Sequence, residues 1–182
     1  MGQGALLKPV VLVGMMGAGK TAVGTALARM LGVPFVDSDE EIVNAAKMSI
    51  AEIFARDGEP FFRARETEVI ARLLSDRPAV ISTGGGAFLA GANRDLIARH
   101  GVSVWLKADL DLLWRRVRHK NTRPLLRTAN PKATLAGLLE QRAPVYALAQ
   151  LAVEAEPALS IEQMAEKVIG TLKAQPGVIG ET

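Results

Sequence analysis

The chain has 182 residues, of which 49% are hydrophobic and 4% aromatic, so one domain with a mainly aliphatic core is expected. It has no cysteine, which excludes disulfide bonds and thiolate metal sites. No stretch approaches the roughly 18 apolar residues of a membrane span, and the N-terminal apolar stretch is too short and glycine-rich for a secretion signal. A cytoplasmic protein without a membrane partner is therefore expected. No long apolar patch demands a protein partner, so a monomer is expected as well.

The net charge of +3 comes from one segment of the chain. No acidic residue lies between Asp111 and Glu140, whereas seven basic residues do. Without those seven, 15 basic residues face 19 acidic ones, for a net charge of −4. The segment should therefore face an anion, and nucleic acid and the phosphates of a nucleotide are the candidates.

Short β-rich runs alternate with longer helical stretches along the chain, which predicts an α/β fold with a parallel sheet covered on both faces. In such folds the active site lies at the carboxyl ends of the strands. The tail after Pro176 is expected to fray. Strands are expected at 10–13, 35–37, 79–82, 102–106 and 151–153, and helices at 21–31, 39–47, 50–57, 60–75, 93–100, 109–118, 131–149 and 161–173.

Residues 14–21, GMMGAGKT, match the P-loop pattern G-x-x-x-x-G-K-[ST] between an apolar strand and a helix. The glycines let backbone N–H groups point at phosphate oxygens, and the helix N-terminus adds partial positive charge. Lys20 should reach the β- and γ-phosphates of ATP, and the Thr21 hydroxyl should ligate Mg²⁺. A chance glycine turn before a helix is the alternative. The predicted nucleotide-binding residues here are Gly17, Ala18, Gly19, Lys20, Thr21 and Ala22.

Two carboxylates, Asp37 and Asp39, follow the second predicted strand. Alternation along an extended segment places both on one side. Asp37 is predicted to serve the metal. Asp39 is predicted to accept a hydrogen bond from the nucleophilic hydroxyl, either orienting it or acting as its base. The alternative for Asp39 is that it only caps the next helix.

A glycine triplet, Gly84, Gly85 and Gly86, follows the strand AVIST. Three glycines allow a close approach to the backbone and expose N–H donors, although a flexible turn is the alternative. Arg63 and Arg142 are candidates for bidentate binding of a substrate carboxylate. For any one arginine, an ordinary solvated side chain is the alternative.

Two further arginines lie in the basic segment. Arg123 lies in a stretch with little apolar periodicity that fits a mobile loop, from which it could neutralise charge on the transferred phosphoryl group. Arg116 could stack on adenine. The alternative is a solvated basic face or an RNA-binding patch. RNA binding is disfavoured because Trp114 is the only aromatic residue of the run.

Six motifs occur together in one order: GMMGAGKT, VDSD, FFRARE, STGGG, the R-x₆-RPLL stretch and QRAPVY. Together they resemble the shikimate kinases, small P-loop kinases similar to nucleoside-monophosphate kinases, over about 10–173. The resemblance implies transfer of the γ-phosphate of ATP to the 3-hydroxyl of shikimate, in chorismate and aromatic amino-acid synthesis. It also implies a three-layer P-loop domain over 1–182 with a five-stranded parallel sheet of order 2-3-1-4-5.

The resemblance further implies a helical substrate-binding region at about 39–65 and a lid at about 118–130. By matched position, shikimate contacts Asp39, Arg63, Gly85 and Arg142, with Gly84 and Gly86 beside them. The implied catalytic residues are Asp39, Lys20 and Arg123. The remaining implied roles are Mg²⁺ binding by Thr21 and Asp37, phosphate binding by Lys20 and Arg123, adenine stacking by Arg116, and support of Arg63 by Glu66.

Three rival interpretations remain at this level. A gluconate kinase is disfavoured because paired arginines best suit a carboxylate on a rigid ring, although gluconate also carries a carboxylate. A GTPase-like switch or RNA-binding protein lacks the N-K-x-D base-recognition motif. A degenerate relative is disfavoured because Lys20, Thr21, Asp37 and Asp39 are all present.

Overall fold

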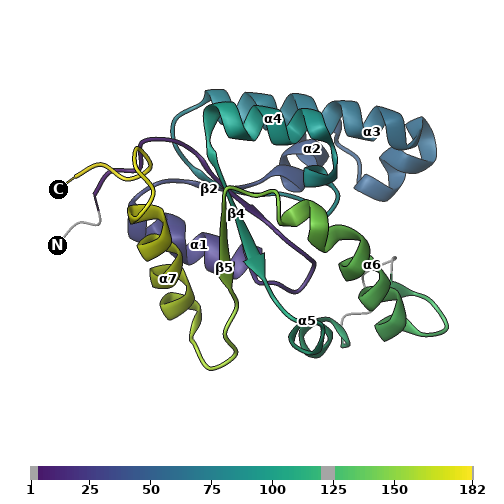
Figure 1. The fold of residues 1–182 in the computed structure, drawn as a ribbon. Coiled ribbons are helices and arrows are strands. Elements are labelled where there is room, and N and C mark those ends of the chain that lie inside the picture. The colour runs from purple at the N-terminus through teal and green to yellow at the C-terminus, as the bar shows by residue number, and fades with distance from the viewer. Residues whose placement is uncertain (1–3, 120–125, 182) are drawn as a thin grey trace.

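A computed structural model describes residues 4–119 and 126–181 of the chain. Five strands form one sheet with all pairs parallel and the order β2-β3-β1-β4-β5, which confirms the predicted fold class and strand order (Figure 1). The strands are β1 (Val10–Val13), β2 (Phe35–Asp37), β3 (Val80–Ser82), β4 (Val102–Lys107) and β5 (Leu151–Glu154).

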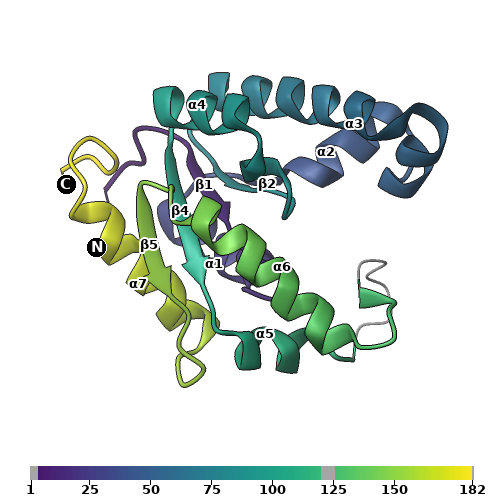
Figure 2. The same cartoon turned by 45° about the vertical axis from the view of Figure 1, so that its right-hand side comes forward.

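Helices cover both faces of this sheet. They are α1 (Lys20–Leu31), α2 (Ser38–Ala46), α3 (Ile50–Ser75), the short 3₁₀ helix η1 (Ala87–Leu89), α4 (Gly91–His100), α5 (Leu110–Val117), α6 (Pro131–Tyr146) and α7 (Ile161–Lys173). Helices α1 and α7 lie side by side on one face, and α3 and α4 lie together on the other (Figures 1 and 2). Within the described ranges, none of the helices combines the length and apolar character of a membrane span.

The central strand β1 explains why the sheet is buried on both faces. Its four residues, VVLV, are all fully buried. A strand covered on both faces reads as a continuous apolar run instead of an alternating one. Its Leu12 lies opposite Ser82 of β3 and Val104 of β4, and Ser82 in turn lies opposite Asp37 of β2. The segments that follow β1, β2 and β3 therefore emerge together at one edge of the sheet.

Helices α2 and α3 share a second, smaller core that lies apart from the main one. Its buried side chains are Ile42, Ile53, Phe62 and Val69. The two helices predicted at 50–57 and 60–75 form one run, α3, broken at Gly58 by a non-helical backbone (φ 85°, ψ 168°). Ser49 begins this run with a capping box to Glu52.

The expectation that the tail frays after Pro176 is wrong. Val178 is only 1% exposed, and its carbonyl accepts a hydrogen bond from the Leu7 N–H at 2.8 Å. Leu6 and Ile179 form an antiparallel bridge. The N-terminal and C-terminal segments therefore pair on one side of the molecule (Figure 1). The tail is ordered by a partner far away in the sequence, which no local pattern indicates.

Shortening the buried Val178 side chain should destabilise the protein. Val178→Ala is expected to lower the free energy of unfolding by about 2 kcal/mol, because it removes two buried methyl groups and leaves a void. Urea denaturation followed by circular dichroism measures this. Leu148→Ala, at a side chain that is 62% exposed, serves as the control and should change stability by less than about 0.5 kcal/mol. Equal losses in the two variants would contradict an ordered tail.

Candidate active site

A cavity of about 1100 Å³ opens at the carboxyl ends of β1, β2 and β3. Its walls come from the phosphate loop (14–21), from α2 and α3, from the glycine triplet (84–86), and from α5 and α6. Ala18 is buried and does not line the cavity, and Arg123 lies outside the described residues. The predicted residues that line it are Gly17, Gly19, Lys20, Thr21, Ala22, Asp37, Asp39, Arg63, Gly84, Gly85, Gly86, Arg116 and Arg142.

The phosphate loop curls between β1 and α1. Gly17 and Gly19 have φ values of 85° and 99°, which favour glycine, and the Ala18 N–H donates to the Met15 carbonyl at 3.1 Å. Gly19 is the N-cap residue of α1 and offers no side chain to the first amide groups of the helix. Such amide groups bind anions, because they carry the positive end of the helix dipole.

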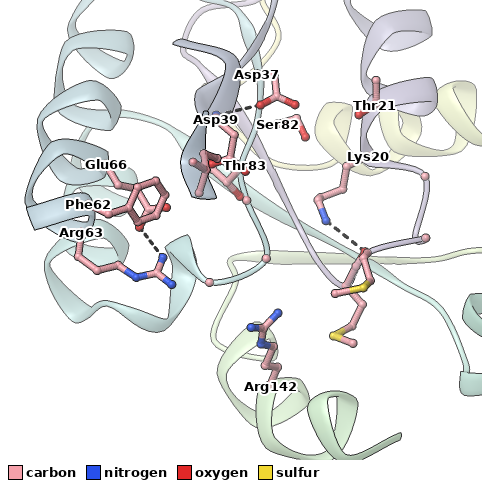
Figure 3. A pocket seen from close by; sticks show the side chains of 18 of the residues that line it. Lys20, Thr21, Asp37, Asp39, Phe62, Arg63, Glu66, Ser82, Thr83 and Arg142 are labelled. Atoms are coloured by element: carbon pink, nitrogen blue, oxygen red, sulfur yellow. Dashed lines mark hydrogen bonds and ion pairs between the residues drawn. The ribbon is translucent and has the colours of Figure 1, made fainter. Parts of the chain in front are cut away.

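Two cationic side chains lie against this loop. The Lys20 ammonium donates to the carbonyls of Gly14 at 2.5 Å and Met15 at 3.1 Å (Figure 3). From α5, the Arg116 guanidinium donates to the Gly17 carbonyl at 3.0 Å. Both cations therefore lie where the loop would hold phosphates. The stacking of Arg116 on adenine stays a prediction.

Asp37 is the residue that caps α2. Its Oδ1 accepts hydrogen bonds from the N–H groups of Asp39 at 2.8 Å and Glu40 at 3.2 Å. The alternative that Asp39 is the capping residue is therefore wrong. Both capping bonds use Oδ1, so the other oxygen of Asp37 takes no part in them.

Thr21 and Asp37 suit a hard cation such as Mg²⁺. Both line the cavity, and they offer a hydroxyl and a carboxylate oxygen. In the part of the chain that the structure describes, no group of three or more histidine, cysteine or acidic residues could hold a metal alone. Mg²⁺ characteristically combines one or two protein oxygens with phosphate oxygens and water, so this sparse donor set fits it.

The Asp39 carboxylate has the environment of a reactive group. Its Oδ1 is buried and has no hydrogen-bond partner. Burial raises the pKa of Asp39, and the nearby Asp37 carboxylate raises it further, while Lys20 and Arg63 act in the opposite direction. A buried acceptor without a hydrogen bond costs free energy. Because this oxygen lies at a cavity, we infer that a ligand supplies the missing donor.

Each glycine of the triplet makes room for a different side chain. A Cβ added to Gly84 would lie 2.6 Å from Oδ2 of Asp39. At Gly85 it would lie 2.7 Å from the Arg142 guanidinium, and at Gly86 it would lie 2.6 Å from that of Arg63. Real Cβ atoms do not come this close to other atoms, so a side chain at any of the three positions would displace the carboxylate or guanidinium beside it. Side chains from α2, α3 and α6 thereby converge on one turn (Figure 3).

Arg63 is anchored from behind by a buried acid. Its guanidinium donates to Glu66 at 2.9 Å, and the Glu66 side chain is only 1% exposed. Burial raises the pKa of Glu66, while the hydrogen bond and charge of Arg63 lower it. Glu59 adds a longer contact of 3.5 Å from the cavity side. This pairing fixes the direction of Arg63 but leaves 34% of its side chain exposed to a ligand.

An apolar wall of the cavity was not predicted. It is formed by α3, where the rings of Phe54 and Phe62 pack at 4.8 Å between centroids. The spacing of Ile50 and Phe54 indicates one helix face, but only the fold shows that this face turns to the cavity. Glu66, which also lines the cavity, was expected to support Arg63, and the structure places it there. The other lining residues that were not predicted are Met15, Met16, Ala51, Glu59, Ser82 and Thr83.

Replacing Asp39 with an uncharged residue should stabilise the protein. Because the pKa of Asp39 is raised in the folded state, its contribution to stability is present below its unfolded pKa and is lost as the pH rises through the folded value. Ionised Asp39 therefore destabilises the fold at neutral pH. Asp39→Asn is expected to raise Tm at pH 7 by about 3 °C.

Thermal unfolding monitored across a pH series measures this effect. The gain in Tm should shrink as the pH falls through the pKa of Asp39. Asp95→Asn, at an exposed carboxylate of α4, is the control and should leave Tm nearly unchanged at every pH. A lower Tm for Asp39→Asn at pH 7 would contradict a destabilising carboxylate.

Comparisons with known proteins agree with this geometry. The family model for shikimate kinase matches residues 16–173. A shikimate kinase of Ruegeria pomeroyi is 65% identical over 178 residues, which cover 98% of this chain and 91% of the relative. One of Cereibacter sphaeroides is 66% identical over 174 residues, covering 96% and 87%.

A solved structure also matches this chain, and it is again a shikimate kinase. The shikimate kinase of Acinetobacter baumannii, in complex with shikimate, superposes with a TM-score of 0.85 at 38% identity. The match covers 92% of this chain and 94% of that one. The family model, the two sequence relatives and the solved structure all name the same enzyme, and the chain belongs to the shikimate kinase family.

Proposed function

We propose that this protein transfers the γ-phosphate of ATP to the 3-hydroxyl of shikimate, giving shikimate 3-phosphate and ADP for chorismate and aromatic amino-acid synthesis. The observation that carries the proposal is the convergence of Asp39, Arg63 and Arg142 on the glycine triplet beside the phosphate loop. One acid and two arginines suit an acceptor that carries both a hydroxyl and a carboxylate. The shikimate complex of the Acinetobacter baumannii relative supports the same acceptor.

The two arginines would hold the carboxylate of the acceptor. Each guanidinium presents a planar set of donors that matches a carboxylate in two parallel hydrogen bonds. Arg63 already has its direction set by Glu66, so less freedom is lost when the substrate binds.

The apolar wall favours a cyclic acceptor over gluconate. Ile50, Phe54 and Phe62 offer a hydrocarbon surface on the side of α3. A carbocyclic ring has a hydrocarbon face that can cover this surface, whereas an open-chain polyol would leave its hydroxyl groups there without partners. Shikimate and gluconate both carry a carboxylate, so the two arginines alone do not distinguish them. The apolar wall does.

Asp39 would align the nucleophile. Its partnerless Oδ1 accepts the hydrogen bond of the 3-hydroxyl and directs the hydroxyl oxygen at the γ-phosphorus. As the new P–O bond forms, the bond from phosphorus to the bridging oxygen breaks and its electron pair leaves with ADP. The hydroxyl proton passes to the Asp39 carboxylate, late in the transfer, because the transition state is loose.

The phosphate loop would hold the donor. Its backbone amides surround the phosphates, and Lys20 exchanges the carbonyls of Gly14 and Met15 for negatively charged phosphate oxygens, which are stronger acceptors. Thr21 and Asp37 would hold Mg²⁺, which neutralises charge on the β- and γ-phosphates when it is bound. Arg116, beside Gly17, is proposed to stack on the adenine.

The lid of the proposed enzyme rests on the sequence alone. Residues 120–125 lie outside the described residues, so a lid at about 118–130 and the role of Arg123 on the transferred phosphoryl group rest on the motif. A monomeric cytoplasmic enzyme is also proposed. In its support, the large hydrophobic side chains exposed in the described ranges come from separate segments: Leu7, Phe61, Leu89, Leu148 and Ile161.

An assay of ADP release tests the proposed reaction. Protein with ATP and Mg²⁺ is given shikimate, gluconate or no acceptor. We expect rapid ADP release with shikimate and background release in the other two reactions. Release that is equally fast without an acceptor, or faster with gluconate, would reject shikimate as the substrate.

Removing the Arg63 guanidinium should weaken binding of shikimate. Arg63→Ala is expected to raise the KM for shikimate by about 10- to 100-fold, because charge-assisted hydrogen bonds to the carboxylate are lost, with a smaller change in the KM for ATP. Steady-state kinetics measures both constants. Arg65→Ala is the matched control two residues away, since Arg65 is exposed and pairs with Glu68. Similar kinetics for the two variants would remove Arg63 from the acceptor site.

A further inference from the structure

One buried hydroxyl connects the glycine triplet to the arginine of α6. Tyr146 ends α6, is only 1% exposed, and donates to the Gly85 carbonyl at 2.6 Å across 61 residues of sequence. The Arg142 guanidinium, one helical turn earlier, approaches the same glycine, and its charge acts on the Tyr146 hydroxyl. The hydroxyl therefore contacts one group that the proposed function assigns to shikimate and lies near a second.

The chemistry of the three groups limits the roles that they can take. A guanidinium can only donate and a carbonyl can only accept, whereas a phenol does both. Because the Tyr146 hydroxyl gives its proton to the Gly85 carbonyl, its oxygen remains able to accept from the Arg142 guanidinium. Burial raises the pKa of Tyr146, and the opposing effect of Arg142 is smaller, so the hydroxyl keeps its proton at neutral pH.

The hydroxyl is held in place by the core of the protein. The Tyr146 ring packs against Trp105 of β4 with 6.1 Å between ring centroids. Farther along the same turn, Asn93 of α4 donates to the Ala87 carbonyl at 2.8 Å, and Arg94 donates to those of Phe88 and Leu89 at 2.8 Å and 3.0 Å. Helix α4 thus fixes the segment after the triplet, and Tyr146 fixes the triplet itself.

A fixed carbonyl also fixes the next amide. The peptide unit is planar and trans, so the carbonyl of Gly85 and the N–H of Gly86 point in opposite directions. By holding the carbonyl on the side of α6, Tyr146 directs this N–H away from α6. The side chain of Arg63 approaches at Gly86, so the orientation of the peptide matters to both arginines.

We propose that Tyr146 is a positioning residue for the acceptor, whose hydroxyl sets the orientation of the Gly85 peptide and of the Arg142 guanidinium before shikimate binds. This inference rests on the proposed function and adds to it a residue that does not line the cavity. Without the hydroxyl, the Gly85 carbonyl loses its partner and Arg142 loses a nearby acceptor, and the substrate must order them on binding.

Tyr146→Phe tests the proposal, because it removes the hydroxyl and keeps the ring against Trp105. We expect the KM for shikimate to rise about 10-fold, with kcat and the KM for ATP each changing less than about 3-fold. In an Arg142→Ala background, the same substitution should raise the KM for shikimate by a smaller factor than in the wild-type background, because the part of the effect that passes through Arg142 is already lost.

The outcomes separate positioning from general stability. An unchanged KM for shikimate in Tyr146→Phe would overturn the proposal, as would equal increases in the KM values for shikimate and ATP. Tyr146→Leu, which also loses the ring, controls for packing and should lower Tm more than Tyr146→Phe does. The wild-type protein is assayed in parallel, since absence of shikimate-dependent ADP release there would reject the proposed function before any variant is compared.

Discussion

The register of three neighbouring strands is the constraint on which the site depends. Leu12 of β1 lies opposite Ser82 of β3, which lies opposite Asp37 of β2. Because parallel strands end at the same edge, the phosphate loop, the acidic pair and the glycine triplet emerge side by side from a buried sheet. The two halves of the proposed reaction, phosphate binding and acceptor binding, are thus positioned by backbone hydrogen bonds of the sheet, and side chains from the helices complete them.

The buried acids of the site lower the stability of the fold but orient the side chains around them. Asp39 keeps a buried oxygen without a partner, and Glu66 is a buried acid whose charge is offset by Arg63. Buried charges of this kind rarely stabilise a fold compared with apolar side chains, so the aliphatic core has to offset them. What they provide is orientation: Glu66 holds the Arg63 guanidinium before a ligand binds, which reduces the ordering required on binding.

Local signals in the sequence were enough for the parts of the fold that local chemistry determines. The P-loop motif, the five strands and the helix begun by Ser49 each follow from neighbouring residues, and the strand order followed from family resemblance. Contacts between distant segments were not accessible in this way. The bond between Tyr146 and Gly85 and the ordered tail at Val178 depend on how elements pack, which periodicity does not encode. The Asp37 cap is local, but Asp37 and Asp39 are both residues that commonly cap helices, so residue type did not distinguish them.

A crystal structure of the protein with Mg²⁺, ADP and shikimate would show directly how the acceptor lies in the cavity. We expect shikimate against the glycine triplet, its carboxylate on Arg63 and Arg142, and its 3-hydroxyl oxygen about 3 Å from the Asp39 carboxylate, facing the nucleotide phosphates. Shikimate bound away from the triplet, or in the reverse orientation with its carboxylate beside Asp39, would contradict this expectation.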